Sequence, residues 1–314
     1  MDIFCIGEAV IDFLPGGEPA SYIRNLGGAP ANVAIAVSRN GLEAGFCGKV
    51  GDDDFGRFLV STLKENGVRS LCDGFCGGAV TTMAFVPLTG GGERSFTFAR
   101  KPGADMFLTK EDVKKTDIES ATVVHAGSCS LSAEPAASAT FYALRLAGSM
   151  GKIVSFDVNY RNLMWKNDSK AAAEKIFEVL PYVDLLKVSE EEAAMLGGED
   201  GFFNLMESNG LSAVVETLGP EGAVCYFKGG TLRVGGTSAK PVDTTGAGDA
   251  FWAGFLSKLV MQGMGRVSDL TEEKIKKAME YGNVAGSLCI LSKGAISSPP
   301  TRAMVEKYLE KGFD

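Results

Sequence analysis

Residues 121–159 of the chain read ATVVHAGSCSLSAEPAASATFYALRLAGSMGKIVSFDVN and contain its repeating unit. The stretch begins and ends with short apolar runs, ATVVHAG (121–127) and KIVSFDVN (152–159), which are typical of buried strands. Between them, residues 133–149 have the apolar period of a helix. A strand, a helix and a second strand in this order predict two parallel strands in one sheet, joined by a crossover helix.

The same alternation of short apolar runs and longer helical periods extends along most of the chain. Pro30 begins one helical segment and Gly41 follows its end, which are positions that these residues favour in helices. The predicted strands lie at 1–8, 45–51, 121–127, 152–159, 183–189 and 212–219, and the predicted helices at 30–40, 54–66, 133–149, 170–180, 190–196, 247–263 and 272–290. This rhythm predicts an α/β fold in which helices cover both faces of a mostly parallel central sheet, a three-layer α/β/α sandwich.

One region interrupts this rhythm with two strands and no helix. TTMAFVPLT (81–89) and ERSFTFAR (93–100) are joined by glycines, which predicts a hairpin. Residues 12–26 are also strand-like and rich in Gly and Pro. We therefore expect a small β-layer outside the main sheet, formed by about 12–26 and 81–103, that acts as a lid. Two edge hairpins without a moving role are the alternative. No linker divides the chain, so residues 1–314 are predicted to form a single domain.

Composition and charge exclude several classes of function. The 314 residues include 31 Lys and Arg against 39 Asp and Glu, without a basic run, so nucleic-acid and membrane partners are not expected. A single histidine, His125, excludes a histidine-rich metal site. The chain begins without a signal-peptide pattern, and no run reaches about 18 apolar residues. We therefore expect a cytoplasmic protein with reduced cysteines.

The strongest local signal is PVDTTGAGDAFWAGF, residues 241–255. Gly246, Ala247 and Gly248 open an apolar helix, and its first N–H groups can converge on an anion because no bulky side chain intervenes. Asp249 follows in the first helical turn. Amide donors beside a fixed carboxylate suit phosphoryl transfer, because the amides stabilise the moving phosphoryl group while the carboxylate accepts the proton of an attacking hydroxyl. The alternative is an ordinary glycine-rich turn with an acidic residue at a helix start.

Two motifs carry a resemblance to a known family. DTTGAGDAF (243–251) resembles the C-terminal signature of the phosphofructokinase-B, or ribokinase-like, carbohydrate kinases, and NLGGAPANVAIAVSRNGLEAGFCGKVGDDDFG (25–56) is similar to their N-terminal signature. The fructokinase subgroup looks closest, on GEAVIDFLP (7–15), GGERSFTFARKPGADMFLT (91–109), HAGSCSLSAEP (125–135), FDVNYRNLMW (156–165), LLKVSEEEAAMLGG (185–198) and GAISSPPT (294–301). The resemblance implies the ribokinase-like fold and transfer of the γ-phosphoryl group of ATP to the 6-hydroxyl of fructose.

Other activities of the family stay open. A 2-keto-3-deoxygluconate kinase would also contain a segment like FDVNYRNLMW, and its sugar acid needs a cation, for which Arg100 or Arg161 would serve. A riboside kinase is the third option within the family. From a different class, a non-catalytic relative would hold sugar and nucleotide for regulation, but such a protein has no need of Asp249.

The resemblance also assigns residues to the sugar and to the reaction. Phe98 and Arg100 on the predicted lid are expected to close over the sugar, and Arg161 is expected to bind a sugar oxygen or the transferring phosphate. A surface charge without a role is the alternative for Asp12 and Arg161. The implied catalytic set is Asp249 as the base, Gly246, Ala247 and Gly248 as the anion hole, and Arg161. The implied sugar-binding set is Asp12, Gly27, Gly28, Asn32, Phe98, Arg100, Arg161 and Asp249.

A further set is implied for the nucleotide, the metal ions and the partner subunit. The nucleotide-binding residues are Lys187, Thr217, Gly219, Gly222, Gly246, Gly248 and Asn283, with Ala285 and Gly286 leaving room for adenine. Mg²⁺ accompanies ATP, and Glu192 is implied to reach it, directly or through water, although Ser189 stands where the family commonly has Asn. A monovalent cation, K⁺, is implied near Asp243, Thr245 and Gly294. The exposed lid strands are expected to pair in a homodimer.

Overall fold

The computed structural model describes residues 1–314 except 19, 72–73, 86–96, 238–239, 293–297 and 312–314. Nine strands of the described chain form one large sheet. In spatial order they are β13 (Gly230–Val234), β12 (Ala223–Phe227), β11 (Ala213–Thr217), β10 (Leu185–Ser189), β9 (Ile153–Asp157), β8 (Val123–Gly127), β1 (Ile3–Ile6), β4 (Ala44–Cys47) and β5 (Arg69–Ser70). The strands from β11 to β5 are parallel, whereas β12 and β13 extend one edge in antiparallel pairs. The predicted, mostly parallel sheet is therefore confirmed.

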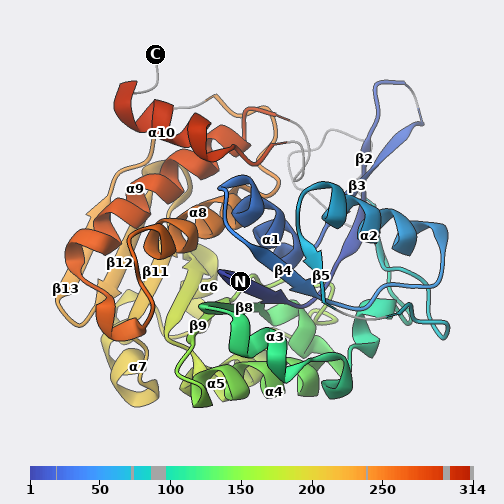
Figure 1. Ribbon diagram of the computed structural model, residues 1–314, viewed down its shortest axis with the longest axis horizontal. Coiled ribbons are helices and arrows are strands. Elements are labelled where there is room, and N and C mark those ends of the chain that lie inside the picture. The colour runs from blue at the N-terminus through green and yellow to red at the C-terminus, as the bar shows by residue number, and fades with distance from the viewer. Residues whose placement is uncertain (19, 72–73, 86–96, 238–239, 293–297, 312–314) are drawn as a thin grey trace.

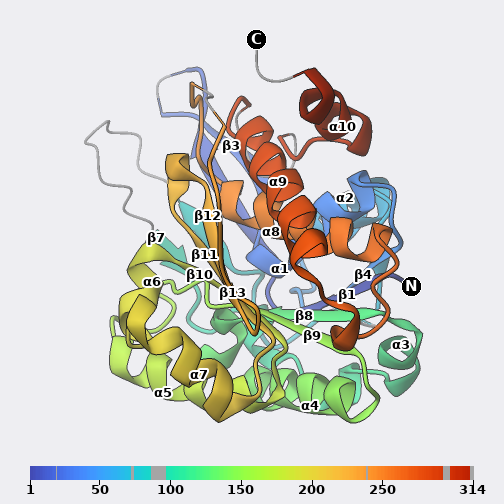
Figure 2. The same cartoon turned by 90° about the vertical axis from the view of Figure 1, so that its left-hand side faces the viewer.

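Helices cover both faces of this sheet, and Figures 1 and 2 show the two layers with the sheet between them. Along β1, Phe4 and Ile6 pack toward one layer, while Ile3 and Cys5 pack toward the other, as the pleat of a strand requires. One layer contains α3 (Lys115–Ser120), α4 (Ala136–Ser149), α5 (Ser169–Val179), α6 (Glu190–Met195) and α7 (Phe202–Asn209). The other contains α1 (Ala29–Arg39), α2 (Asp54–Glu65), α8 (Ala247–Met261) and α9 (Glu272–Cys289), and α10 (Arg302–Lys311) packs on α9.

A second, smaller sheet stands apart from the large one. Its strands follow the order β3 (Tyr22–Gly27), β2 (Val10–Pro15), β6 (Met83–Phe85) and β7 (Thr97–Ala99). The rings of Phe13 and Phe85 stack at 4.8 Å across β2 and β6 and give this sheet an apolar face. In Figure 1 the hairpin of β2 and β3 projects beyond the main body of the molecule. The predicted β-layer outside the main sheet is thus present.

Several elements differ from the sequence prediction. The helix predicted at 133–149 begins only at Ala136, with Pro135 at its N-cap and a 3₁₀ segment over Ser128–Ser132 before it. The prediction also lacked the edge strands β12 and β13 and the short or peripheral helices α3, α7 and α10. Within the part of the chain that the structure describes, no helix has the length and apolar character needed to cross a membrane.

The carboxyl ends of the parallel strands meet at one edge of the sheet. The chain reaches this edge with Glu8 after β1, Asn159 after β9 and Thr217 at the end of β11. The start of α8 lies at the same edge, because a Cβ built on Gly248 would stand 3.5 Å from the ammonium nitrogen of Lys187 on β10. Ligands of open α/β sheets bind outside this edge, so the residues predicted for function converge where the fold favours a site.

Candidate active site

A small polar cavity lies between the carboxyl edge of the large sheet and the small sheet. Its described walls are formed by Glu8, Val10, Asp12, Gly28, Ala29, Asn32, Phe98, Cys129, Asn159, Arg161, Met164, Thr245, Gly246 and Asp249. The structure therefore brings together most of the residues predicted for the sugar, namely Asp12, Gly28, Asn32, Phe98, Arg161 and Asp249. Val10 and Asp12 come from β2 and Phe98 from β7, so the small sheet supplies one wall of the cavity.

Asp249 stands in the first turn of α8 and is held by a side chain from α1. The amide Nδ2 of Asn32 donates a hydrogen bond to Asp249 Oδ2 at 2.8 Å. Gly246 precedes the helix with φ of 79°, a left-handed conformation that glycine adopts without strain. Burial raises the pKa of Asp249 above its ordinary value, which moves the carboxylate toward the range of a general base at neutral pH. Asn32 thus fixes the carboxylate through one oxygen and leaves Oδ1 for a proton.

Asp12 shares the cavity with Asp249 and is packed from behind by Gly27. Burial and then the charge of Asp249 raise the pKa of Asp12 to about 7, although Arg161 opposes the shift. A Cβ built on Gly27 would lie 2.1 Å from Asp12 Oδ2. Gly27 therefore makes room for the Asp12 carboxylate and does not itself line the cavity, although it belongs to the sugar-binding set that the resemblance implies.

This packing gives a first prediction. In Gly27→Ala, the new methyl group displaces the Asp12 carboxylate, so we expect KM for the sugar to rise by about 10- to 100-fold, the usual effect of losing a hydrogen bond to a charged group. KM for the nucleotide should stay unchanged. Steady-state kinetics with each substrate varied in turn measures both. Gly148→Ala on α4 is the matched control, since a Cβ there meets no atom within 4 Å. An unchanged sugar KM in Gly27→Ala would remove Asp12 from the sugar site.

Arg100 requires a correction. Its guanidinium is buried and pairs with Asp105, with Nε at 2.8 Å and Nη2 at 2.7 Å from Oδ2, and its Nη1 donates to Ser132 Oγ at 3.1 Å. It is not among the residues that line the polar cavity. A buried arginine beside a carboxylate pairs with it because burying either charge alone is costly. We therefore withdraw Arg100 as a direct sugar ligand and assign it to the base of the small sheet.

The charges of the polar cavity are unbalanced toward acid. Glu8, Asp12 and Asp249 contribute carboxyl groups, whereas Arg161 is the one cationic side chain among its described walls. Glu8 is buried and accepts a hydrogen bond from the main-chain N–H of Ala29 at 3.2 Å. Carboxylates are hydrogen-bond acceptors, and hydroxyl groups are donors that suit them. The cavity therefore fits a neutral ligand with several hydroxyl groups.

A groove continues from the polar cavity toward the nucleotide residues. Its described walls are Asn159, Tyr160, Arg161, Asn162, Lys187, Ser189, Glu191, Glu192, Thr217, Thr244, Thr245, Gly246, Gly248 and Asp249. The first N–H groups of a helix have no partner within it, so the start of α8 presents amide donors to the groove. Lys187 adds an ammonium group, which pairs with Asp157 at 2.9 Å. The groove thus combines amide donors, a lysine and an arginine, the chemistry that holds phosphate groups.

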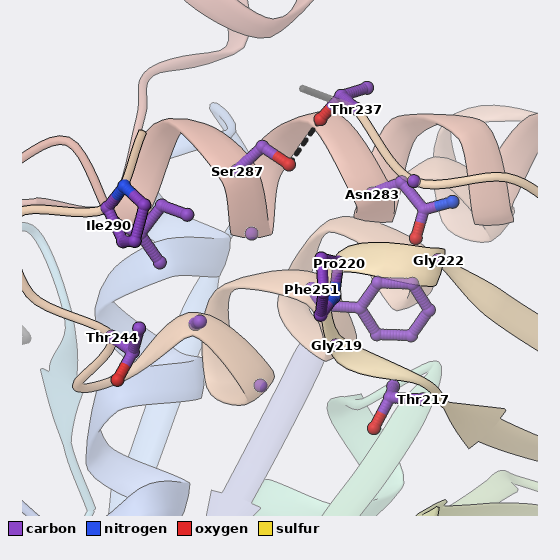
Figure 3. Close-up of a pocket in the computed structure, with 15 residues that line it drawn as sticks. Thr217, Gly219, Pro220, Gly222, Thr237, Thr244, Phe251, Asn283, Ser287 and Ile290 are labelled. Carbon is purple, nitrogen blue, oxygen red and sulfur yellow. Dashed lines mark hydrogen bonds between the residues drawn. The ribbon is translucent and has the colours of Figure 1, made fainter. Parts of the chain in front are cut away.

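An apolar pocket of about 320 Å³ opens at the far end of the groove. Figure 3 shows its walls, with Phe251 from α8, Ile290 after α9 and Pro220 from the loop between β11 and β12. The predicted nucleotide residues Thr217, Gly219, Gly222, Gly248 and Asn283 line it, as do Ala247 and Gly286. Apolar walls with a few polar groups suit a planar aromatic base. Ala285 instead packs toward Gly254 of α8, so it does not leave room for adenine as predicted.

Asn283 has a fixed orientation in this pocket. Its Nδ2 donates hydrogen bonds to the main-chain oxygens of Val234 at 3.3 Å and Gly235 at 3.0 Å. Both donors of the amide group are therefore engaged, and the carbonyl oxygen is left for a ligand. A base with an exocyclic amino group fits such an acceptor.

Glu192 does not present a bare carboxylate to a metal ion. Its Oε2 accepts a hydrogen bond from the main-chain N–H of Ser189 at 2.8 Å, and its Oε1 accepts one from Tyr160 at 2.7 Å. With Ser189, it forms the capping box at the start of α6. Glu192 was expected to contact Mg²⁺ either directly or through a water molecule. Because both carboxylate oxygens already accept hydrogen bonds, contact through water fits this arrangement better.

The residues predicted for a monovalent cation form a turn before α8. Asp243 Oδ1 accepts hydrogen bonds from the main-chain N–H and the hydroxyl of Thr245, at 2.9 and 2.8 Å. Gly294 lies outside the described residues. Among the residues that the structure describes, no three His, Cys, Asp or Glu side chains come together as a metal site.

Sequence reasoning missed several residues of these walls. In the polar cavity they are Glu8, Val10, Ala29, Cys129, Asn159 and Met164, and in the apolar pocket they include Pro220, Gly236, Thr237, Phe251, Ser287 and Ile290. Glu8 and Asn159 had a usable signal, since each lies in a segment from which another residue was chosen, GEAVID and FDVNYR. The apolar members have no such signal, because in a sequence they are indistinguishable from core residues.

The three spaces are continuous through shared residues. Gly246 and Asp249 line both the polar cavity and the groove, and Thr244 and Gly248 line both the groove and the apolar pocket. A carboxylate therefore stands where a site for hydroxyl groups meets a site for phosphates, and a site for a base lies beyond. This arrangement defines a phosphotransferase that acts on an alcohol group.

Comparison with known proteins identifies the family. The pfkB family of carbohydrate kinases matches residues 1–302. Probable fructokinase-7 from Arabidopsis thaliana is 40% identical over 98% of this chain and 92% of its own length. Fructokinase with bound ATP from Xylella fastidiosa has 30% identity and a TM-score of 0.90, over 99% of this chain and 98% of that one. A double mutant of fructokinase from Vibrio cholerae O395, bound to fructose, ADP and potassium ion, has 33% identity and a TM-score of 0.87, over 98% of each chain. The chain belongs to the pfkB family of carbohydrate kinases and has the ribokinase-like fold.

Proposed function

We propose that this protein is an ATP-dependent fructokinase that phosphorylates the 6-hydroxyl of fructose. The observation that carries the proposal is the position of Asp249, where the polar cavity meets the groove, with one carboxylate oxygen fixed by Asn32. The relatives support the choice of substrates, because the Arabidopsis protein is named a probable fructokinase and the Vibrio cholerae structure holds fructose and ADP.

In the proposed reaction Asp249 is the general base. Its Oδ1 accepts the proton of the 6-hydroxyl as the sugar oxygen forms a bond to the γ-phosphorus, and the bond from that phosphorus to the bridging oxygen of ATP breaks to release ADP. The amides at the start of α8, residues 246–248, stabilise the charge on the moving phosphoryl group. The raised pKa of Asp249 makes it a stronger base than an exposed carboxylate.

The charge of the polar cavity favours fructose over a sugar acid. A carboxylate ligand would enter a space with Glu8, Asp12 and Asp249, where Arg161 alone would offset its charge. Arg100 was the second cation considered for a sugar acid, but its guanidinium group forms an ion pair with Asp105. Like charges brought together at a binding site cost several kcal/mol. This separates our proposal from a 2-keto-3-deoxygluconate kinase of the same family.

The nucleotide is proposed to lie along the groove and the apolar pocket. Adenine would stack on Phe251 and donate a hydrogen bond from its amino group to the free oxygen of Asn283. The triphosphate would follow Gly248 and Lys187 toward Asp249. The Xylella fastidiosa relative, solved with ATP, supports this choice of nucleotide.

Two metal ions complete the proposal. Mg²⁺ would be held mainly by phosphate oxygens and water, with Glu192 in contact through water, and would neutralise charge on the phosphates when bound. K⁺ would lie near Asp243 and Thr245. Support for K⁺ comes from the potassium ion in the Vibrio cholerae relative.

A panel of phosphoryl acceptors tests the proposed function. With ATP, we expect kcat/KM for fructose to exceed that for 2-keto-3-deoxygluconate by ~100-fold or more, because of the like-charge penalty in the polar cavity. Coupled ADP release measures the rates with fructose, mannose, ribose, a riboside and the sugar acid, and ³¹P NMR identifies the 6-phosphate. If the sugar acid is turned over faster than fructose, the substrate is the sugar acid. If no acceptor gives release of ADP, the result supports a non-catalytic relative.

The small sheet is proposed to be a lid and a dimer interface. Its edge strand β3 exposes apolar side chains, with Tyr22 at 39% and Ile23 at 57% of their surface. An open strand edge with apolar side chains is a pairing surface. Sedimentation should therefore give a dimer for the native chain and a monomer for Ile23→Lys. A native chain that sediments as a monomer would remove this part of the proposal.

We also propose that the protein works in the cytoplasm on small molecules. The cysteines that the structure describes, Cys5, Cys47, Cys76, Cys129, Cys225 and Cys289, are buried free thiols. Free thiols are typical of reducing compartments.

A further inference from the structure

A buried ion pair stands beside the start of α8. The ammonium nitrogen of Lys187, on β10, lies 3.0 and 2.9 Å from the two carboxylate oxygens of Asp157, at the end of β9. The two side chains are 7% and 2% exposed. The same nitrogen would lie 3.5 Å from a Cβ built on Gly248. The pair therefore joins the edge of the sheet to the amide donors of the groove.

The two members of the pair are held differently. Asp157 is anchored to the backbone, because its Oδ1 also accepts a hydrogen bond from the main-chain N–H of Asn159 at 3.1 Å. Lys187 ends a flexible four-carbon stem, and the carboxylate of Asp157 decides where its ammonium group stays. Burial alone would lower the pKa of Lys187, but the charge of Asp157 raises it above its ordinary value, so the ammonium group keeps its charge.

The other carboxylates around Lys187 are engaged elsewhere. Glu192 on α6 accepts two main-chain hydrogen bonds, and Asp249 on α8 accepts one from Asn32. Among the described residues, Asp157 is the carboxylate within ion-pair distance of Lys187. Asp157 lines neither the polar cavity nor the groove nor the apolar pocket, whereas Lys187 lines the groove. Asp157 therefore does not itself line a space for a ligand, and its ion pair with Lys187 is its direct contact with a residue of the groove.

We propose that Asp157 is a positioning residue for phosphoryl transfer, which holds the ammonium group of Lys187 against the start of α8, where it meets the phosphoryl group that moves. This inference rests on the proposed function, because it requires a triphosphate in the groove. A buried ion pair is seldom needed for stability, since well-packed apolar residues replace such pairs without loss in other proteins. Its place beside the groove gives it a role that apolar residues would not fill.

The test is Asp157→Asn, which keeps the shape and a hydrogen-bond acceptor but removes the charge that fixes Lys187. We expect kcat to fall by about 10- to 100-fold, the effect of a misplaced group in an active site. KM for the sugar should change by less than about threefold, because Asp157 lies outside the polar cavity. A kcat close to that of the native enzyme would overturn the proposal, as would a loss confined to the sugar KM.

A double-mutant cycle with Lys187→Met separates positioning from a direct role. If Asp157 acts through Lys187, Asp157→Asn should change kcat by less than about twofold in the Lys187→Met background. An undiminished loss in that background would show that Asp157 acts by itself, on Mg²⁺ or on the fold, and would overturn the proposal. The comparison between Lys187→Met and the double variant also stands alone if Asp157→Asn does not fold, because the double variant leaves no unpaired charge in the buried pair.

Asp184→Asn is the matched control. Asp184 precedes β10, accepts a hydrogen bond from the main-chain N–H of Val154 at 2.8 Å, and lies at the opposite end of the strand from the groove. We expect a lower midpoint of thermal unfolding and an unchanged kcat. All rates are measured with the acceptor that the native enzyme uses best. The test therefore remains valid if the substrate is a sugar other than fructose. If the protein does not transfer phosphoryl groups at all, the native enzyme already shows this.

Discussion

Replacing Asp249 with Asn should reduce kcat for sugar-dependent release of ADP by ~10³-fold or more, the upper part of what a general base contributes. The substitution keeps the size of the side chain and an oxygen that accepts the hydrogen bond from Asn32. It removes the atom that takes the proton of the sugar. Calorimetric titration should therefore give nearly native binding of fructose and of ATP, while stopped or coupled assays show the loss of turnover.

The control for Asp249→Asn is Asp54→Asn. Asp54 also lies in the first turn of a helix, α2, where it interacts with the helix dipole but faces none of the three spaces of the site. We expect its kcat to be unchanged. A kcat for Asp249→Asn within tenfold of the native value would end the assignment of Asp249 as the base, and lost binding of both ligands would make its role structural.

The fold could be predicted where local pattern and tertiary structure agree. Residues 121–159 form β8, α4 and β9 as predicted. The apolar side chains in each of these segments are spaced so that they fall on the part of the strand or helix that is buried in the fold. The hairpin of β12 and β13 was missed for a physical reason. Whether an antiparallel pair joins β11 at the edge of a parallel sheet depends on long-range pairing, which no local period records.

The residues of the site also differ in how far local sequence could predict them. Gly246 and Asp249 could be predicted because the amide donors and the carboxylate belong to one helix start, whose geometry is local. Arg100 was assigned to the sugar through the family resemblance and its place with Phe98 on the predicted lid. The structure buries it beside Asp105, and only the folded chain shows that this carboxylate needs a partner. Gly27 likewise depends on the register between β2 and β3, which brings it against Asp12.

Replacing Arg161 with Met should lower kcat/KM for fructose by ~10²- to 10³-fold, the range measured when one donor that stabilises developing charge is removed. Arg161 lines both the polar cavity and the groove, and it is the cation that offsets Asp12 and Asp249. Methionine preserves much of the apolar stem, so the loss reports the guanidinium group. We expect hydrolysis of ATP without sugar to fall by less than about tenfold, because Lys187 and the amides of α8 remain.

The ratio of the two losses decides which ligand Arg161 serves. A selective loss in the sugar reaction assigns the guanidinium group to an oxygen of fructose, since only that reaction places a sugar beside Asp12. Equal losses in both reactions would assign it to the phosphates and contradict the prediction. Arg145→Met, an exposed arginine on α4, is the control and should leave both rates unchanged. Because Arg161 offsets the three carboxyl groups of the cavity, its loss should also weaken any residual use of a sugar acid further than the use of fructose.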